Sequence, residues 1–363
     1  GKHPDKFYQG ECVDLGCLKF PYTSLDIENL KNKILYFETS RGCPFRCAYC
    51  LSSADGNGIR YFPMEYVKKG FKFFFDKKVP LVKLIDRTFN CDSKRAVEIV
   101  NYIIENSTDT RVHFEIEASI LTDELILALN SAPKDMFQIE VGVQTINHKS
   151  LTAVNRNYDL EKIRHNIRRL SEPKNIHIHL DLIAGLPFED YSSFIKSFNF
   201  VYAMRPDMLQ LGFLKVLKGT QISERFFSDI KYADFPPYEV ISTNWISASE
   251  ILELKKVENA VDIFYNSGKF FNSIRSISEN PPYNNNPFSL FEQLGEKIKR
   301  SEKAGKLANT ALYEILYQKF GECIVEELAV DFITNNKTAK LPKFLHREMS
   351  KSFKTHCIEL INN

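Results

Sequence analysis

Three cysteines stand close together in the amino-terminal part of the chain. Cys43, Cys47 and Cys50 form a C-x3-C-x2-C triplet, and Tyr49 directly precedes the last of them. Cysteine thiolates are the usual protein ligands of iron–sulfur clusters, so one short loop with three thiolates can hold three irons of a 4Fe–4S cluster. The fourth iron then has no protein ligand, and an open metal position distinguishes catalytic from structural metal sites. The triplet therefore predicts a catalytic 4Fe–4S cluster.

Two other uses of the triplet are open to such a sequence. A structural zinc site needs a fourth Cys or His at close spacing, and the next such residue after Cys50 is Cys91. A disulfide framework needs an oxidising compartment, whereas eight cysteines without regular pairing indicate a reducing one. The cluster is therefore favoured. The other cysteines are expected to be plain or buried thiols: Cys12, Cys17, Cys91, Cys323 and Cys357.

The composition indicates a protein with a large core and no strong charge bias. The chain has 363 residues, enough for one barrel and an appendage, and 44% of them are hydrophobic, including 29 Phe. A net charge of +2 gives no argument for nucleic acid. We expect no signal peptide, and no apolar run reaches the roughly 18 residues of a membrane span. We therefore expect a cytoplasmic protein.

Strand-like and helix-like segments alternate from Ile34 to Gly219. Strands that alternate with helices of about 10–15 residues form parallel βαβ units. Six units are too few for a closed eightfold barrel, so the pattern predicts an α/β fold with a partial (β/α)6 TIM-type barrel. The expected strands cover residues 34–39, 81–85, 112–118, 137–143, 176–183 and 208–216, and the expected helices cover residues 64–77, 93–105, 122–130, 159–170 and 191–203.

Three successive strands of this series carry one polar face. In the third to fifth strands every second residue is polar, and the residues between them are apolar. A parallel sheet covered on both faces should instead be apolar almost throughout. If helices cover the apolar faces, the polar faces line the lumen of a curved sheet, where a polar ligand would supply their partners. The polar residues are His113, Glu115, Glu117, Gln138, Glu140, Gln144, His177, His179 and Asp181.

The cysteine loop, taken with Tyr49 and the preceding strand, resembles the signature of the radical SAM superfamily. In that family the open iron binds the amino and carboxylate groups of S-adenosylmethionine (SAM). Electron transfer from the cluster then cleaves the sulfonium and yields a 5′-deoxyadenosyl radical. The resemblance implies two cofactors, SAM and a 4Fe–4S cluster whose ligands are Cys43, Cys47 and Cys50.

Four further segments are similar to those of radical SAM enzymes related to oxygen-independent coproporphyrinogen dehydrogenase. They are FEIEAS, EVGVQTIN, NRNYD and HLDLIAGLPFED. By this resemblance Glu115, Gln144 and Asp181 would contact the adenosyl half of SAM. Arg156 would pair with the methionyl carboxylate, for which its bidentate fork is suited.

The remaining cofactor-binding residues follow from the same resemblance. The superfamily's Gly-Gly-Glu after the second strand is replaced here by Asp86-Arg87-Thr88-Phe89, so Asp86 and Thr88 would take the methionyl-ammonium role. Tyr49 on the cysteine loop is also assigned to the cofactor. Gly185 at the end of the fifth strand has no side chain, so the backbone can approach the ligand there.

A narrower resemblance is to cobalamin-associated, class B-like radical SAM proteins. The segments GLPFEDYSSF, MLQLGFLKVLKGT and PPYEVISTNWIS carry it. Members of this subgroup have a cobalamin-binding domain, then the radical SAM barrel, then an uncharacterised helical region. The chain has no D-x-H-x-x-G motif, so the cobalamin-binding domain is expected to be absent from it, leaving exposed an apolar or Tyr-rich surface where that domain would dock.

The expected domain organisation has three parts: a linker or lead-in at 1–33, the barrel at 34–233 and a helical domain at 234–363. The last part should contain helices near residues 249–266, 288–300, 310–320 and 324–333, with a Pro/Asn-rich loop at 280–287. Its final segment is basic, and we expect a solvated face there. The residues concerned are Lys337, Lys340, Lys343, Arg347, Lys351 and Lys354, against one acid, Glu348.

The expected protein is an enzyme that cleaves SAM reductively and abstracts hydrogen from an unactivated C–H bond, for cobalamin-dependent methylation. A cobalamin-independent radical SAM oxidoreductase or rearrangement enzyme stays open. So does a non-catalytic iron–sulfur or zinc protein that acts as a scaffold or sensor. The expected partners are an unidentified substrate, a reductant such as flavodoxin or ferredoxin, and the cobalamin-binding domain, with no membrane and no nucleic acid.

Overall fold

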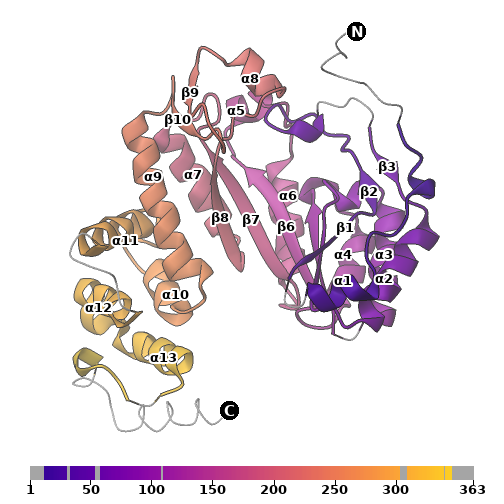
Figure 1. Ribbon diagram of the computed structural model, residues 1–363. Helices are drawn as coiled ribbons and strands as arrows, with labels where there is room; N and C mark the ends of the chain where they lie inside the picture. Colours follow the sequence, from indigo (N-terminus) through magenta and orange to yellow (C-terminus); the bar gives the residue numbers. More distant parts are fainter. Residues whose placement is uncertain are drawn as a thin grey trace. The chain divides into compact units, whose positions relative to one another are not determined.

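The computed structural model describes residues 12–30, 33–53, 58–107, 109–302, 309–338 and 340–345 (Figure 1). By contacts between residues, the chain divides into two compact units. Unit 1 comprises residues 1–46, 52–140 and 161–177, and unit 2 comprises residues 47–51, 141–160 and 178–363. The domain boundaries predicted at 33/34 and 233/234 do not coincide with this division and stay predictions.

Six strands form one sheet whose spatial order is the order of the sequence, β1-β4-β5-β6-β7-β8. The pairs β1–β4, β4–β5 and β7–β8 are parallel. Neighbouring parallel strands that follow one another along the chain are the arrangement of a barrel wall. The predicted partial (β/α)6 barrel is thereby confirmed. The strands are β1 (Leu35–Phe37), β4 (Leu81–Leu84), β5 (Arg111–Ile116), β6 (Phe137–Gln144), β7 (His177–Ala184) and β8 (Met208–Phe213).

The predicted alternation of polar and apolar residues is present in these strands. Along β6 and β7 every second side chain is fully buried, and the side chains between them are only partly buried. The buried set is apolar, from Phe137 to Val143 and from Ile178 to Ala184. The partly buried set contains the polar residues. The sheet therefore has one dry face and one face that polar groups and a ligand can share.

Unit 1 contains the first helices of the barrel. Their apolar stripes supply much of its core, as in α2, where Val67, Phe71 and Phe74 are buried. Asp92 caps α3 by accepting from the Arg95 N–H, and Thr122 caps α4 by accepting from the Leu125 N–H. The helices are α1 (Ser24–Asn29), α2 (Met64–Asp76), α3 (Ser93–Asn106), α4 (Asp123–Asn130) and α6 (Leu160–Ser171), and the short strands β2 (Ser40–Arg41) and β3 (Arg60–Tyr61) pair antiparallel.

The lead-in segment is folded over residues 15–29, where an extended linker was expected. A 3₁₀ turn at Leu15–Cys17 is followed by α1, whose amino terminus has a reciprocal capping box between Thr23 and Asp26. The Phe20 ring packs edge-on against Phe73 and Phe74 of α2, with centroids 5.1 and 5.5 Å away. The sequence signal that could have shown this is the T-S-L-D capping pattern.

Unit 2 contains the last two barrel strands with their helices and the carboxyl-terminal helices. The helices predicted after residue 248 are present, but the antiparallel pair β9–β10 and helix α10 were not foreseen. Its elements are α5 (His148–Ala153), α7 (Tyr191–Tyr202), α8 (Gln221–Arg225), β9 (Ile230–Tyr232), β10 (Val240–Thr243), α9 (Ala248–Val261), a π-helical turn (Asp262–Asn266), α10 (Phe271–Glu279), α11 (Pro287–Glu302), α12 (Asn309–Phe320) and α13 (Val325–Asn336).

Two sequence predictions lie outside the described residues. Arg347, Glu348, Lys351 and Lys354 of the basic segment belong to the undescribed 346–363 range, as does Cys357. Within the part of the chain that the structure describes, none of the helices is both long enough and apolar enough to cross a bilayer.

A buried polar cluster joins the end of β6 to the start of α7. Glu189, only 1% exposed, accepts hydrogen bonds at Oε1 from the hydroxyls of Thr145 (2.6 Å) and Ser197 (2.9 Å). Its other carboxyl oxygen has no hydrogen-bond partner among the described residues. Burial raises the pKa of Glu189 to about 7. The cluster fixes the residues that directly follow Gln144, which is one of the predicted site residues.

The raised pKa of Glu189 predicts a pH-dependent contribution to stability. Between its unfolded pKa, near 4.5, and its folded pKa, about 7, Glu189 is protonated in the folded protein and ionised in the unfolded chain. Its contribution to the free energy of unfolding is therefore complete below the unfolded pKa and is lost as pH rises through about 7. Glu189→Gln should therefore gain stability relative to wild type between about pH 5 and about pH 7.5, by on the order of 1–3 kcal/mol. Urea unfolding at several pH values measures this. The exposed Glu172→Gln is the control, and parallel pH curves for Glu189→Gln and wild type would contradict the account.

Candidate active site

The cysteine loop begins at a turn that only glycine can make without strain. Gly42 has φ +90°, and a Cβ on it would lie 2.1 Å from the Gly58 carbonyl oxygen. Cys43 follows in unit 1, where its Sγ lies 3.5 Å from Thr88 Oγ1. None of the triplet cysteines is in a disulfide; Cys47 is buried, and Cys43 and Cys50 are partly exposed.

The second half of the loop, residues 47–51, is held by backbone hydrogen bonds within unit 2. The Ala48 N–H donates to the Val154 carbonyl, and the Ala48 carbonyl accepts from the Ile222 N–H, both at 2.9 Å. Ala48 itself is fully buried. These bonds tie Cys47 and Tyr49 to the chain just after α5, where Arg156 is located.

Arg156 is the centre of the polar contacts in this unit. Its Nη1 donates to Tyr49 Oη (2.7 Å) and lies 3.7 Å from Cys47 Sγ, and its Nη2 donates to the Gly142 carbonyl (2.5 Å). The guanidinium also stacks over the Tyr158 ring, 4.3 Å from its centroid. One side chain thus connects the cysteine loop to β6. A fixed positive charge beside Cys47 favours the thiolate, the form that binds metal.

Tyr49 is held in its neutral form by this environment. Burial raises the pKa of its hydroxyl, although the Arg156 charge acts in the opposite direction. A neutral hydroxyl can both accept from Arg156 and donate to another group. Tyr49 therefore orients the guanidinium without neutralising its charge, which leaves that charge able to pair with an anion.

Gln144 ends β6 in a strained conformation. Its φ is +68°, in a region that non-glycine residues seldom occupy, and its buried Oε1 has no hydrogen-bond partner among the described residues. The side chain folds back over Gly142, where a Cβ would lie 2.1 Å from Gln144 Nε2 and 3.4 Å from Arg156 Nη2. Strain and an unsatisfied acceptor at one position are typical of ligand-binding sites.

The two residues predicted after the second strand differ in their surroundings. Asp86 is 1% exposed, and its oxygens accept from the Thr39 N–H (2.7 Å), the Thr39 hydroxyl (2.5 Å) and the Ser40 hydroxyl (2.7 Å). These bonds fix the segment that leads into the cysteine loop. Thr88 faces Cys43 and donates to its own neighbour, the Arg87 carbonyl. Contact of either residue with the methionyl ammonium stays a prediction.

Glu115 belongs to a cluster of charged residues on the polar face in unit 1. Glu140 is 3.2 Å from His113 Nε2 and 3.3 Å from Lys83 Nζ, and the hydrogen bond with His113 lowers the pKa of Glu140. Burial, reinforced by the Glu140 charge, raises the pKa of Glu115. The ionised form of Glu115 is destabilised in this way, so a hydrogen bond from a ligand hydroxyl would stabilise it. The contact of Glu115 with the ribose stays a prediction.

Asp181 and Gly185 lie on and just after β7. Asp181 is partly buried and stands in register with Gln210 of β8 on the polar face. Gly185 has φ +87°, and a Cβ there would lie 2.8 Å from Val240 Cγ1. The absence of a side chain at Gly185 is thus required by packing against β10, and its approach to a ligand stays a prediction.

Cys91 lies in the 3₁₀ turn Phe89–Cys91, where the Cys91 N–H donates to the Thr88 carbonyl (3.3 Å). Burial, and next the proximity of Cys43, raise the pKa of its thiol to about 12. A thiol that resists ionisation is a poor metal ligand, in agreement with the predicted packing role. Cys12, Cys17 and Cys323 are exposed.

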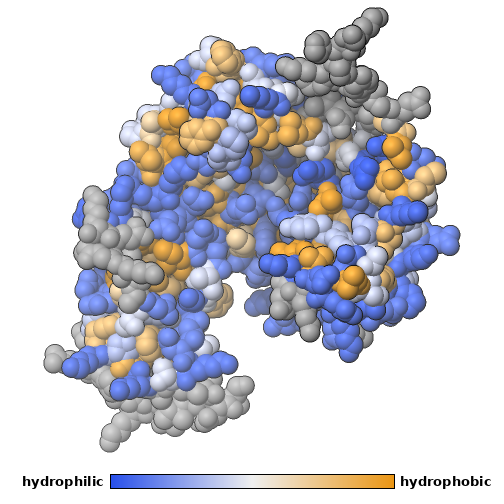
Figure 2. Space-filling view, viewed as in Figure 1, coloured by the Kyte–Doolittle hydropathy of each residue, from blue (hydrophilic) through white to orange (hydrophobic). Residues whose placement is uncertain are grey.

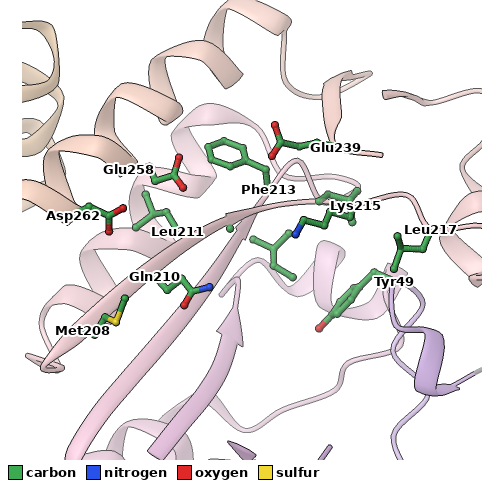
Figure 3. A pocket seen from close by; sticks show the side chains of 13 residues that line it. Tyr49, Met208, Gln210, Leu211, Phe213, Lys215, Leu217, Glu239, Glu258 and Asp262 are labelled. Carbon is green, nitrogen blue, oxygen red and sulfur yellow. The ribbon is translucent and has the colours of Figure 1, made fainter. Parts of the chain in front are cut away.

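Sequence reasoning missed a cavity of about 530 Å³ in unit 2 (Figure 3). Tyr49 lines it together with β8 and with three acidic residues, Glu239, Glu258 and Asp262. The sequence signal available was the i, i+4 spacing of Glu258 and Asp262, which predicts both carboxylates on one face of a helix, and the structure has Glu258 in α9 and Asp262 at the start of the π-helical turn. That spacing does not show that α9 and β8 line the same cavity, and this becomes visible only in the folded structure.

Comparisons with known proteins agree with this fold. Residues 37–201 match the radical SAM superfamily, and residues 228–363 match a family described as "Protein of unknown function (DUF4080)". Taken with the cysteine triplet and the six-stranded sheet, this match shows that residues 37–201 form a radical SAM domain. The carboxyl-terminal part of the chain is of the uncharacterised type that the sequence suggested.

Individual relatives cover only part of this chain. A probable threonylcarbamoyladenosine tRNA methylthiotransferase of Archaeoglobus fulgidus is 24% identical over 56% of this chain and 50% of its own length. A 2-(S-pantetheinyl)-carbapenam-3-carboxylate methyltransferase of Streptantibioticus cattleyicolor is 28% identical over 44% of this chain and 24% of its own length. The chain thus spans at most about half the length of these curated relatives.

A solved structure shares the fold. It is the radical SAM methyltransferase TsrM from Kitasatospora setae, with cobalamin and a [4Fe–4S] cluster bound, at a TM-score of 0.51 and 16% identity over 59% of this chain and 42% of TsrM. At this identity the likeness establishes the fold alone.

The residues present fit the cofactors that a radical SAM domain implies. Three thiols outside disulfides stand on one loop, and the donor set of three cysteines leaves one iron of a 4Fe–4S cluster open. The buried Gln144 Oε1, which has no hydrogen-bond partner among the described residues, offers a polar contact to a ligand beside Arg156. A 4Fe–4S cluster and SAM are therefore the cofactors of this domain.

Apolar side chains are exposed on the part of unit 2 labelled α8, β9 and β10 in Figure 1, and hydrophobic residues reach the surface in that region in Figure 2. Phe227 is 71% exposed, Phe235 65% and Ile241 48%. The Val240 N–H bonds to the Leu214 carbonyl, so β10 lies at the carboxyl end of β8. An exposed apolar surface was expected at this end of the barrel, and what covers it stays a prediction.

The close fit of Gln144 over Gly142 predicts a cost for a single added methyl group. Gly142→Ala must displace the Gln144 amide or the strand, so we expect a loss of about 1–3 kcal/mol in the free energy of unfolding. Gly212→Ala on β8 is the matched control, because its Cβ would meet only the Leu182 carbonyl oxygen, at 3.3 Å. Urea unfolding compares the two variants. Equal stabilities would show that the Gln144 conformation over Gly142 is not fixed.

Proposed function

We propose that this enzyme cleaves SAM reductively and uses the resulting radical chemistry for cobalamin-dependent methylation of an unactivated carbon. The observation that carries the proposal is the contact of Arg156 with Cys47, Tyr49 and the Gly142 carbonyl, beside the strained Gln144. This arrangement combines a metal-ligand thiol, a fixed cation and an unsatisfied acceptor within one unit. A structural zinc or iron–sulfur site requires neither the fixed cation nor the unsatisfied acceptor.

Cys43, Cys47 and Cys50 would hold the 4Fe–4S cluster, which would supply the electron for reductive cleavage of SAM. Within the protein, Arg156 binds the methionyl carboxylate through its charge. Gln144 offers its buried amide oxygen to a donor of the adenosyl half, and Asp181 and Glu115 accept from the ribose hydroxyls. Asp86 bonds to Thr39 and Ser40, which lead into the cysteine loop, and in this proposal Asp86 and Thr88 take the methionyl-ammonium role.

Two observations support the use of cobalamin in this proposal: a cobalamin-containing structure with the same fold, and an exposed apolar surface on this protein. The TsrM structure contains cobalamin by its own description, and Phe227, Phe235 and Ile241 offer an apolar surface at the carboxyl end of β8. A corrinoid-carrying domain that covered these side chains would stand at the end of the barrel where ligands bind. The reductant would be a flavodoxin or ferredoxin, and the substrate is unidentified.

The assignment of Arg156 predicts a specific loss of SAM affinity. Arg156→Ala should weaken SAM binding to cluster-loaded protein by about 2–4 kcal/mol, since it strips a charge-assisted pair from a partly buried carboxylate. Asp181→Ala should cost about 1–3 kcal/mol, the range for hydrogen bonds to a charged group. Anaerobic calorimetric titration with SAM measures both.

Iron content, assayed in parallel, separates loss of SAM binding from loss of the cluster. Arg156→Lys keeps the charge but not the fork, so it should recover only part of the affinity. Arg164→Ala, which removes an exposed arginine paired with Glu161, is the control. Wild-type affinity in both Arg156→Ala and Asp181→Ala would rule out the proposed SAM site.

A further inference from the structure

The cavity beside the cysteine loop is large enough for a small molecule or a side chain. Its volume of about 530 Å³ lies within the range of ligand pockets, roughly 300–1,000 Å³. All of its lining residues belong to unit 2, and in Figure 3 the side chains of Tyr49, Lys215 and Glu258 are seen around one space. Tyr49 also contacts Arg156, so the cavity extends to the contacts of the proposed SAM site.

The two families that match the chain contribute different sides of this cavity. Tyr49 and Ile183 fall within the radical SAM match, whereas the carboxylates of Glu239, Glu258 and Asp262 all fall within the carboxyl-terminal match. The apolar lining comes from β8 and the segment after it. The carboxyl-terminal region thus supplies the acidic groups of a cavity whose other side belongs to the barrel.

Three carboxylates and one ammonium, that of Lys215, line the cavity, so the carboxylates outnumber the cations of the lining. Glu239 is paired with Lys255 at 2.5 Å, and that ammonium lies 4.1 Å above the Phe213 ring, which also lines the cavity. Asp262 is exposed and accepts from Asn266 at 2.7 Å. Glu258, in contrast, has neither a hydrogen bond nor an ion pair among the described residues.

Glu258 is therefore a partly buried carboxylate without a direct ion pair among the described residues. Burial raises its pKa, and the nearby charges of Asp262 and Glu239 act in the same direction, with only Lys255 opposing them. Each of these effects makes the anion less stable where it stands. A cation bound against Glu258 would stabilise the ionised form of this carboxylate.

We propose that this cavity binds an aliphatic ammonium or guanidinium group of the substrate, with Glu258 as its anchor. The inference rests on the proposed function, because it names the substrate class of that same site. Met208, Leu211 and Phe213 would contact the alkyl chain that carries the cation. The bound chain would lie between Glu258 on α9 and Tyr49 on the cysteine loop.

An organic cation fits this lining better than a metal ion does. Magnesium and calcium require about six oxygen ligands, yet one of the three carboxylates is already neutralised by Lys255 and much of the remaining lining is apolar. Methylene groups with a terminal charge match such a mixed surface. The cation could belong to a peptide side chain or to a free amine, and both have the same chemistry at Glu258.

Calorimetric titration of the cluster-loaded full chain in the presence of SAM tests the proposal without any turnover. The probes are Nα-acetyl-lysine methylamide for a peptide side chain, agmatine for a free cation, and Nα-acetyl-norleucine methylamide as the neutral analogue. We expect saturable binding of at least one cationic probe and at least tenfold weaker binding of the neutral one. Glu258→Gln should weaken the cationic probe at least tenfold. Glu253→Gln, on the same helix but outside the cavity lining, should leave it unchanged.

The outcomes separate this inference from the proposed function. If no cationic probe binds wild type, if Glu258→Gln binds it equally well, or if Mg²⁺ alone displaces it, the inference is overturned while SAM binding and cleavage are untouched. If the cation binds through Glu258 but SAM is neither bound nor cleaved, the cavity assignment stands and the proposed function fails. Preference for the lysine derivative would indicate a peptide, and preference for agmatine a free amine.

Discussion

The position of the Arg156 guanidinium is the constraint on which the account of this enzyme depends. It is fixed by one carbonyl, one hydroxyl and one aromatic ring, from Gly142, Tyr49 and Tyr158, and it lies beside the Cys47 thiol. These contacts fix a partly buried cation beside the cysteine loop, where it can bind the carboxylate of a ligand. Glycine at position 142 is part of the same constraint, because a Cβ there would occupy the space of Gln144 and crowd Arg156.

The alternation along the barrel strands explains how one sheet carries both a core and a site. Phe137, Ile139 and Val141 are buried on one face of β6, while Glu140, Gly142 and Gln144 occupy the other. The carboxyl-terminal region, residues 228–363, also contributes to a cavity in unit 2. Its helix α9 presents Glu258 to a cavity that Tyr49 also lines, so the uncharacterised region can select what reaches the radical chemistry.

Much of this could be predicted from the sequence, because period and spacing are local. The cysteine triplet, the order of the six strands and the polar faces at Glu115, Gln144 and Asp181 all follow from residues within a few positions of one another. The bonds from Thr39 and Ser40 to Asp86, and the packing of Gly185 on Val240, join segments far apart in the chain, and no local pattern encodes them. The cavity acids were missed for the same reason, since Glu258 on a helix is an ordinary surface residue until β8 is placed beside it.

The most direct test of the central claim is product analysis. The full chain, reconstituted anaerobically with iron and sulfide, is reduced with dithionite in the presence of SAM, with and without added cobalamin, and 5′-deoxyadenosine is quantified by liquid chromatography. The account predicts release of 5′-deoxyadenosine by the wild type, and none by a variant in which Cys43, Cys47 and Cys50 are all changed to Ala. A cluster-loaded wild type that binds SAM but forms no 5′-deoxyadenosine under any of these conditions would contradict it.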